Sequence, residues 1–171
     1  MNKPLKKKRP DIHEISLLVA NKPGVLVRCA LVFARRGYNI DSLVVSPSVN
    51  PKYSRMTITA QGDPKTLDQI IKQTGKLVDV IHCSEHTGVD SVDRELSLFK
   101  VKCPPAKKSS LLRLAKKAKA QILNQSQGAV ILEKSGITDE LDALEESLKE
   151  FGIIEMVRSG KLVMAVGKEA T

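Results

Sequence analysis

The residues of this chain best suited to bind a small ligand form a short segment between a predicted strand and a predicted helix. The segment is Asn21-Lys22-Pro23-Gly24-Val25-Leu26. Glycine lets the backbone come close to a ligand, and the first N–H groups of a helix lack intrahelical partners and carry partial positive charge. Such a loop can bind a carboxylate or a phosphate without a basic side chain, while Asn21 can add a polar contact. A Pro-Gly pair before a helix is more often a plain turn, so this loop alone does not establish a ligand site.

A second polar residue, Asn39, follows the end of the same predicted helix. Gly37 suits the left-handed position just after a helix, and the next strand is predicted to begin at Ile40. We therefore expect Asn39 to face a ligand site or a dimer interface.

The sequence offers no set of residues for catalysis or metal binding. His13, His82 and His86 lack the spacing of metal ligands, and no G-x-S-x-G, phosphate-loop or dinucleotide-binding motif is present. No nucleophile stands beside a base. Because His82 is in phase with Val78 and Val80, we expect it in the core or at an interface rather than as a ligand.

The three cysteines do not form a recognisable framework. Cys29, Cys83 and Cys103 are odd in number and far apart, which argues against both a disulfide framework and a zinc site. They are expected to be small buried apolar residues.

The net charge of +9 is concentrated in two stretches without acidic residues, residues 1–10 and residues 100–119. They hold 13 of the 28 basic residues, and the rest of the chain has 15 basic against 19 acidic residues. A phosphate-contacting surface for nucleic acid is one interpretation. A disordered basic tail over residues 1–10 plus the solvated face of a helix is the other, favoured because no aromatic residues are interleaved. Docking to an acidic protein partner stays open.

The hydropathy pattern contains neither a membrane span nor a secretory leader. No apolar run approaches the ~20 residues that cross a bilayer, and residues 1–10 contain no apolar core of a signal peptide. These features predict a cytoplasmic protein.

The first half of the chain is predicted to fold in the order strand, helix, strand, strand, helix, strand. Clean alternation marks the strands, and Asp63-Pro64 is a strong helix start. This βαββαβ order is the α+β, ferredoxin-like arrangement, with both helices on one face of a four-stranded antiparallel sheet. Leu18, Leu43 and Val45 are expected on the other face, which a second domain or subunit should cover.

The second half is predicted to repeat this fold. Glu95-Leu96-Ser97-Leu98-Phe99 echoes Glu14-Ile15-Ser16-Leu17-Leu18, which suggests an internal duplication. Thr138 is expected to cap an acidic helix. The predicted organisation is therefore a tail at 1–10, a first domain at 11–84, a linker at 85–93 and a C-terminal ferredoxin-like domain at 94–171.

Several segments together resemble one known family. They are Asn21 to Leu26, Phe33-Ala34-Arg35-Arg36-Gly37-Tyr38-Asn39-Ile40-Asp41-Ser42-Leu43, Ser54 to Ile58, Lys76 to Val80, Asp93 to Leu96 and Arg158-Ser159-Gly160. The chain resembles the regulatory small subunits of acetolactate (acetohydroxyacid) synthase. The second domain departs from that family at Lys116 to Ile122, where a Phe-Arg pair is common.

The resemblance implies that the first domain is an ACT domain, which binds amino acids at a homodimer interface. Carried over by position, Asn21, Gly24, Val25 and Leu26 would form one side of the effector site, and Asn39 and Ile40 of the partner subunit the other. The effector would be a branched-chain amino acid, usually valine.

The resemblance also implies a non-catalytic role. The chain would activate a catalytic subunit that holds thiamine diphosphate, magnesium and often FAD, and would make it sensitive to valine in branched-chain amino acid biosynthesis. Two alternatives remain: an ACT-domain sensor controlling a different enzyme, and a ferredoxin-like RNA-binding protein. The second is weakened because the predicted sheet lacks base-stacking aromatic residues.

Overall fold

The computed structural model describes residues 12–86 and 91–168, so the predicted tail at residues 1–10 lies outside the described residues. The described chain divides into two units. Residues 12–86, 91–93 and 160–168 form the N-terminal unit, and residues 94–159 form the C-terminal unit. No helix in these described ranges is both long and apolar enough to span a bilayer.

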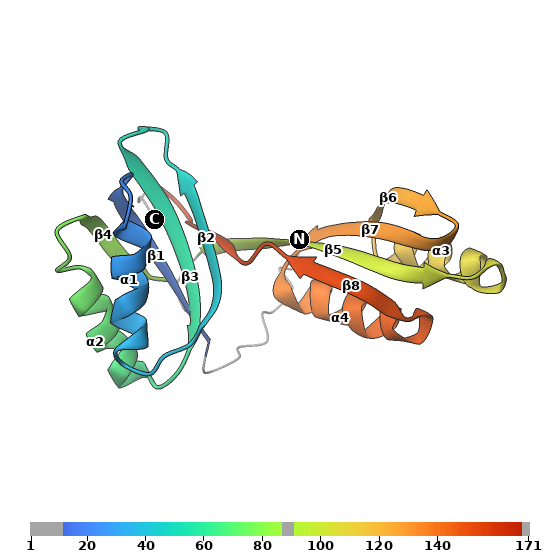
Figure 1. Cartoon of the computed structure of the whole chain (residues 1–171), viewed down its shortest axis with the longest axis horizontal. Coiled ribbons are helices and arrows are strands. Elements are labelled where there is room, and N and C mark those ends of the chain that lie inside the picture. The colour runs from blue at the N-terminus through green and yellow to red at the C-terminus, as the bar shows by residue number, and fades with distance from the viewer. Residues whose placement is uncertain (1–11, 87–90, 169–171) are drawn as a thin grey trace. The chain divides into compact units, whose positions relative to one another are not determined.

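The N-terminal unit has the predicted ferredoxin-like fold. Its strands lie in the order β2-β3-β1-β4, with antiparallel neighbours. Helices α1 and α2 cover one face of this sheet (Figure 1). The elements are β1 (Ile12–Ala20), α1 (Val25–Ala34), β2 (Ile40–Pro47), β3 (Tyr53–Gln61), α2 (Pro64–Thr74) and β4 (Val80–Glu85).

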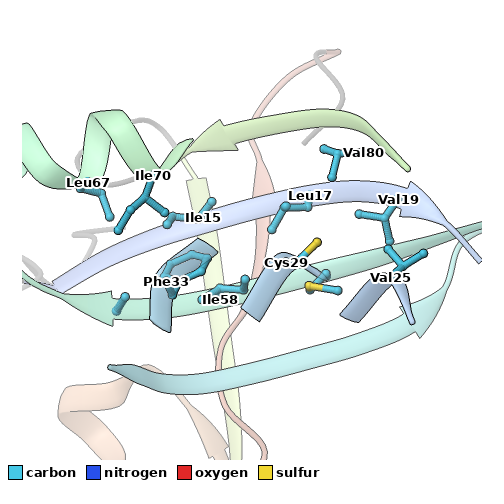
Figure 2. Packing of buried hydrophobic residues seen from close by; sticks show 12 residues of the cluster. Ile15, Leu17, Val19, Val25, Cys29, Phe33, Ile58, Leu67, Ile70 and Val80 are labelled. Carbon is cyan, nitrogen blue, oxygen red and sulfur yellow. The ribbon is translucent and has the colours of Figure 1, made fainter. Parts of the chain in front are cut away.

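The core of the N-terminal unit forms where periodicity brings apolar side chains between helix and sheet (Figure 2). Alternate β1 residues Ile15, Leu17 and Val19 are buried, as expected for one face of a strand. Val25, Cys29 and Phe33 meet them from α1, because residues four apart share one side of a helix.

Helix α2 begins where the sequence predicts. The Asp63 carboxylate accepts the backbone N–H of Thr66 at 2.9 Å, and Pro64 occupies the first turn. The Tyr38 hydroxyl donates to the same carboxylate at 2.8 Å. Its ring lies where a side chain on Gly62 would go, since a Cβ there would stand 1.9 Å from Tyr38 Cε1.

The register of β2 corrects the predicted sheet face. Leu43 pairs with Ile58 and Val45 with Met56, and both partners are buried against the helices. Leu43 and Val45 therefore point toward the helical side, whereas Leu18 points to the opposite face. The prediction that all three share the face away from the helices was wrong, because a strand position shifted by one residue changes face.

The C-terminal unit is a second helix-covered antiparallel sheet, with strand order β6-β7-β5-β8. Its core packs β5 and β7 against two helices, and includes Phe99, Leu111, Leu132, Leu144 and Leu148. Its elements are β5 (Ser91–Cys103), η1 (Pro105–Lys107), α3 (Lys108–Lys117), β6 (Gln121–Ser126), β7 (Gly128–Gly136), α4 (Thr138–Leu148), η2 (Lys149–Phe151) and β8 (Ile153–Arg158). The first three residues of β5, and β9 (Leu162–Ala165), belong to the N-terminal unit.

A cluster of charges fastens α4 to the sheet of the C-terminal unit. The Arg158 guanidinium lies 2.6 Å from an Asp142 oxygen, 2.8 Å from a Glu145 oxygen and 3.6 Å from a Glu95 oxygen. Thr138 does not cap α4 as predicted, because Ile137 occupies the capping position. The Thr138 hydroxyl donates to Glu95 instead, at 3.1 Å.

The five-residue echo between β1 and β5 does not place equivalent residues on equivalent faces. In β1 the serine of the echo, Ser16, points away from the helices, because Ile15 and Leu17 point toward them. In β5, Ser97 lies on the same side as the core residues Phe99 and Val101. The fold is repeated, but the echo is out of phase by one residue.

Residues after β8 return to the N-terminal unit. The Lys161 ammonium lies 2.6 Å from a Glu14 oxygen, and these side chains are only 14% and 10% exposed. Gly160 has φ of 82° and packs so closely that an added Cβ would lie 3.0 Å from Ser42 Cβ. The chain's own C-terminal segment thus covers part of the sheet face opposite α1 and α2.

This return differs from the predicted domain range of 94–171. Residues 160–168 belong with the N-terminal unit, held there by a contact across 147 positions of sequence. The predicted linker at 85–93 also differs, because β4 ends at Glu85 and β5 begins at Ser91.

The histidines and cysteines follow the predictions only in part. His82 is exposed, so of its two predicted positions the core is wrong and the interface stays a prediction, whereas His13 and His86 are buried. Cys29 and Cys103 are buried, which confirms the prediction for them, whereas Cys83 is only half-buried and packs against the core of the N-terminal unit. All three are free thiols.

Candidate functional site

The loop between β1 and α1 has the geometry of a helix start open to solvent. Gly24 occupies the position before the helix with φ of 83°, in the left-handed region. Val25 is buried and anchors the first turn, while Leu26 is 43% exposed. The first-turn N–H groups of a helix have no intrahelical acceptor. The loop therefore presents backbone donors and the positive end of the helix dipole at the surface.

An arginine that the sequence analysis did not single out lies beside this helix start. A Cβ added to Gly24 would stand 3.1 Å from Arg28 Nη1. Arg28 Nη2 lies 2.5 Å from Asp79 Oδ2, which orients the guanidinium. The arginine follows Gly24 by four positions, one helical turn, and that spacing was the available signal. The site therefore has a guanidinium as well as backbone donors for an anion.

Asn21 is held by the neighbouring turn between β2 and β3. Its backbone N–H donates to the Lys52 carbonyl at 2.9 Å, and its side-chain Nδ2 donates to the Pro51 carbonyl at 3.0 Å. In this assignment of the amide, Oδ1 is the remaining acceptor of the side chain. An acceptor of this kind suits an ammonium group rather than a carboxylate.

Asn39 and Ile40 lie at the opposite end of the same sheet. Ile40 pairs with Ala60 on β3, whereas Ala20, next to Asn21, pairs with Tyr53. At the rise of a strand, these two places on β3 are about 23 Å apart. One chain therefore brings Asn21, Gly24, Val25 and Leu26 together and keeps Asn39 and Ile40 away from them.

The side chains at that second place differ in exposure. Asn39 is exposed, and its Nδ2 makes one long contact of 3.4 Å with Asp41 Oδ1. Ile40 is half-buried and packs against the core of the N-terminal unit. Asn39 can meet another molecule without any rearrangement of the core.

The outer side of α1 is unusually apolar for a solvent-facing surface. Val27 is 60% exposed and Leu31 is 43% exposed, one turn apart on the helix. Strand β2 lies at an edge of the sheet, with β3 as its neighbour. Exposed apolar area and an open edge are typical of protein contact surfaces.

Two hollows of the structure lie in the C-terminal unit. One lies beside the β6–β7 hairpin and includes Cys103, Pro105 and Gln125. The other lies between α3 and α4. None of the six predicted site residues lines either hollow. Asn21 and Gly24 are exposed, so the helix start lies at the surface of the N-terminal unit.

The ionisable groups of the N-terminal unit are arranged for packing. His13 Nδ1 lies 2.7 Å from Glu85 Oε1, and its Nε2 is 3.1 Å from the Gly62 carbonyl. Burial raises the pKa of the Cys29 thiol, and raises that of Cys83 to about 12, so neither is an activated nucleophile. Within the described residues, no group of three metal-ligating side chains is present.

Comparison with protein families assigns both units. Residues 15–82 match the model of the AHAS small subunit-like ACT domain. Residues 94–167 match the model of the small subunit of acetolactate synthase. The two matches cover most of the chain.

Individual proteins are similar over nearly their whole length. A probable acetolactate synthase small subunit of Archaeoglobus fulgidus is 42% identical, over 92% of this chain and 98% of its own. An acetolactate synthase small subunit of Mycobacterium bovis is 38% identical, over 92% and 94%. The crystal structure of the acetolactate synthase small subunit from Thermotoga maritima superimposes with a TM-score of 0.83 at 34% identity, over 92% of this chain and 99% of that one.

Proposed function

Because this chain belongs to the family of regulatory small subunits of acetolactate synthase, we propose that it activates a catalytic acetolactate synthase subunit and makes it sensitive to valine. The observation that carries the regulatory part is the open helix start at Gly24, with Arg28 and Asn21 beside it. No residue of the chain is assigned a catalytic role. Thiamine diphosphate, magnesium and FAD belong to the catalytic subunit in this proposal.

The site matches the two charged ends of an amino acid. The carboxylate of valine docks on the first-turn N–H groups of α1 beside the Arg28 guanidinium, which Asp79 holds in place. Its ammonium group donates to Asn21 Oδ1. Leu26 provides exposed apolar surface near the valine side chain.

A second copy of the chain completes the site. Asn39 and Ile40 are too far from Gly24 to reach the same ligand within one chain, but a partner's Asn39 can do so in a homodimer. Exposed Val27 and Leu31 on α1 and the open edge of β2 are the surfaces that such a dimer would bury. The surfaces that favour a dimer are therefore the exposed side of α1 and the edge of β2. They replace the bare sheet face that was expected to carry Leu43 and Val45.

A ligand bound between two subunits can act as an allosteric switch. It binds most tightly to the dimer geometry that brings both half-sites together, and so shifts the population toward that geometry. Coupling of ~1–3 kcal/mol changes the behaviour of a partner about five- to 150-fold. Valine would thus favour a dimer arrangement that activates the catalytic subunit less.

Reconstitution tests this function. The purified chain, supplied with pyruvate, thiamine diphosphate and magnesium, is expected to form no acetolactate, and to raise the rate of the cognate catalytic subunit when added to it. Valine is expected to lower the raised rate. Acetolactate formation by the chain alone, or an unchanged rate of the catalytic subunit, would contradict the proposal. Capture of a different enzyme by the chain would favour the alternative of an ACT-domain sensor.

A further inference from the structure

Four cations on and after α3 form a surface without acidic partners. Residues 100–119 contain eight basic residues and no acid. We call the exposed residues Arg113, Lys116, Lys117 and Lys119 the basic surface. In the described ranges 12–86 and 91–168, no ion pair joins these four to a carboxylate. The residues that the structure describes thus leave the charge of this surface without a paired carboxylate.

Helix α4, which neighbours α3 in the same unit, carries acidic residues that form ion pairs. Acidic residues of α4 are paired with Arg158, and Glu146 with Lys149 at 2.5 Å. Lys134, at the edge of the basic surface, is also paired, with Glu140 at 3.5 Å. Five acidic residues of the unit are thus paired with its own cations, and none of the five is paired with a basic residue of α3.

A groove between α3 and α4 runs beside the basic surface. Its apolar lining comes from Leu114 and Ala118 of the α3 side and Ala143 and Leu144 of α4. Lys117 and Lys119 stand on its wall. Lys119 adopts φ of 55°, just after the end of α3. A groove with an apolar lining and a cationic rim can hold apolar side chains and bind nearby carboxylates at once.

We propose that this groove and the basic surface dock an acidic, partly apolar segment of the catalytic subunit. The inference rests on the proposed function, because that function supplies the partner. The apolar lining accommodates one or two aliphatic side chains of the segment. Its carboxylates pair with Lys117 and Lys119, and long-range attraction from all four cations steers the encounter.

A protein segment fits this surface better than a nucleic acid does. No Phe, Tyr or Trp lines the groove, so bases would find no ring to stack on. Lys116 and Lys117 in the last turn of α3 also complement the helix dipole. The dipole accounts for neither Lys119, which lies beyond the helix end, nor the apolar groove.

The test uses the full chain and the purified cognate catalytic subunit. Binding is measured by calorimetry at low and at moderate salt for the wild type, for Lys117→Glu/Lys119→Glu and for the neutral Lys117→Gln/Lys119→Gln. The matched control is Lys65→Glu/Lys76→Glu, which makes the same charge change at exposed lysines of the N-terminal unit. Circular dichroism and valine titration verify that each variant is folded.

The charge reversal on the groove is expected to weaken binding about tenfold or more relative to the control, and the neutral variant by less. The loss should shrink at moderate salt because screening weakens exposed charge pairs. An affinity within about twofold of the control at low salt would overturn the docking surface. The docking surface would be overturned as well if Lys117→Glu/Lys119→Glu abolished binding of RNA but left the affinity for the catalytic subunit unchanged. If the wild-type chain does not bind the catalytic subunit, the proposed function itself fails.

Discussion

The two units share one fold and use its central strand in opposite ways. In the N-terminal unit, Glu14 points away from the helices and pairs with Lys161 of the returning C-terminal segment. In the C-terminal unit, Glu95 points toward the helices and contacts Arg158 and Thr138. The glutamate of the same Glu-x-Ser pattern thus binds the C-terminal segment in one unit, and residues of β8 and α4 in the other. A one-residue difference in the alternation of the two strands decides which side of the sheet the glutamate faces.

The helix that follows the central strand differs between the units in a way that concerns function. Before α1, Gly24 adopts a left-handed backbone and leaves an open helix start near Arg28. Before α3, the chain passes through Pro104 and a short 3-10 turn, and Lys107 takes the capping position with a right-handed backbone. The candidate anion site is therefore a property of one loop and not of the fold.

The largest expected effect comes from removing one large buried side chain from the core of each unit in turn. Phe33→Ala and Phe99→Ala each remove a fully buried ring, and each should lower the free energy of unfolding of its own unit by about 3–5 kcal/mol. Urea unfolding followed by circular dichroism measures this loss. Valine titration separates the units, since Phe99→Ala should keep valine affinity while Phe33→Ala should lose it. Equal loss of valine binding in both variants would show that the units are not independent.

Removing the Arg158 guanidinium tests the charge cluster of the C-terminal unit. Arg158→Met leaves the carboxylates of Glu95, Asp142 and Glu145 close together without a cation, and should cost about 2–4 kcal/mol of stability. Arg158→Lys keeps the charge and should cost less. Chemical unfolding gives both values. A loss as large in the lysine variant would mean that the shape of the side chain, and not its charge, holds α4.

Substitution at Gly24 tests the open helix start. The aspartate of Gly24→Asp would lie beside Arg28 and occupy the place of the ligand's carboxylate, so valine affinity should fall about 30-fold or more, close to 2 kcal/mol. Gly24→Ala adds no charge and serves as the control; it adds the strain of a left-handed backbone, about 1–2 kcal/mol in stability, and a Cβ 3.1 Å from Arg28 Nη1. Asn21→Ala removes a single hydrogen bond and should weaken binding less than the aspartate does, by about 1.5 kcal/mol, the lower end for a contact with a charged group. Calorimetric titration of valine distinguishes the three.

Unchanged valine affinity in a folded Gly24→Asp protein would show that the effector site lies elsewhere. In the reconstituted enzyme, the same variant should keep activation and lose inhibition by valine.

Low pH should lower the stability of the N-terminal unit through the Asp63 carboxylate, which caps α2. Hydrogen bonds from the Thr66 N–H and the Tyr38 hydroxyl lower the pKa of Asp63 from 3.8 to about 2. Because the pKa is lower in the folded state, the stabilisation is present above pH 3.8 and is lost as pH falls through about 2. Neither α3 nor α4 has a capping side chain. In Asp63→Asn this part of the acid sensitivity should vanish, as thermal melts between pH 5 and 2 would show. An identical pH dependence in the variant would contradict the assignment.

Much of the fold could be predicted because local patterns agree with it. Asp63-Pro64 started α2 as expected, and Gly37 adopted φ of 71° after α1. What failed depended on register and long-range contact. The faces of Leu43 and Val45 are set by their pairing with β3, and the return of Lys161 to Glu14 spans 147 positions. No local pattern encodes such contacts.

The sequence predicted the loop of the candidate site but not the charged side chain beside it. The Pro-Gly sequence before an apolar helix identified Asn21 and Gly24, but Arg28 was not singled out. Its role follows only from the approach of Asp79 in the folded unit. Whether Asn39 joins the site depends on a second chain, which one sequence cannot place.

The central claim is that each effector site combines Gly24 of one chain with Asn39 of another, and mixed dimers test it most directly. Gly24→Asp and Asn39→Ala homodimers should each bind valine weakly. A dimer of one Gly24→Asp chain with one Asn39→Ala chain has one doubly damaged site and one fully wild-type site. Calorimetry of the purified mixed dimer should therefore recover one site of wild-type affinity per dimer. No recovered site in the mixed dimer would contradict a site shared between two chains.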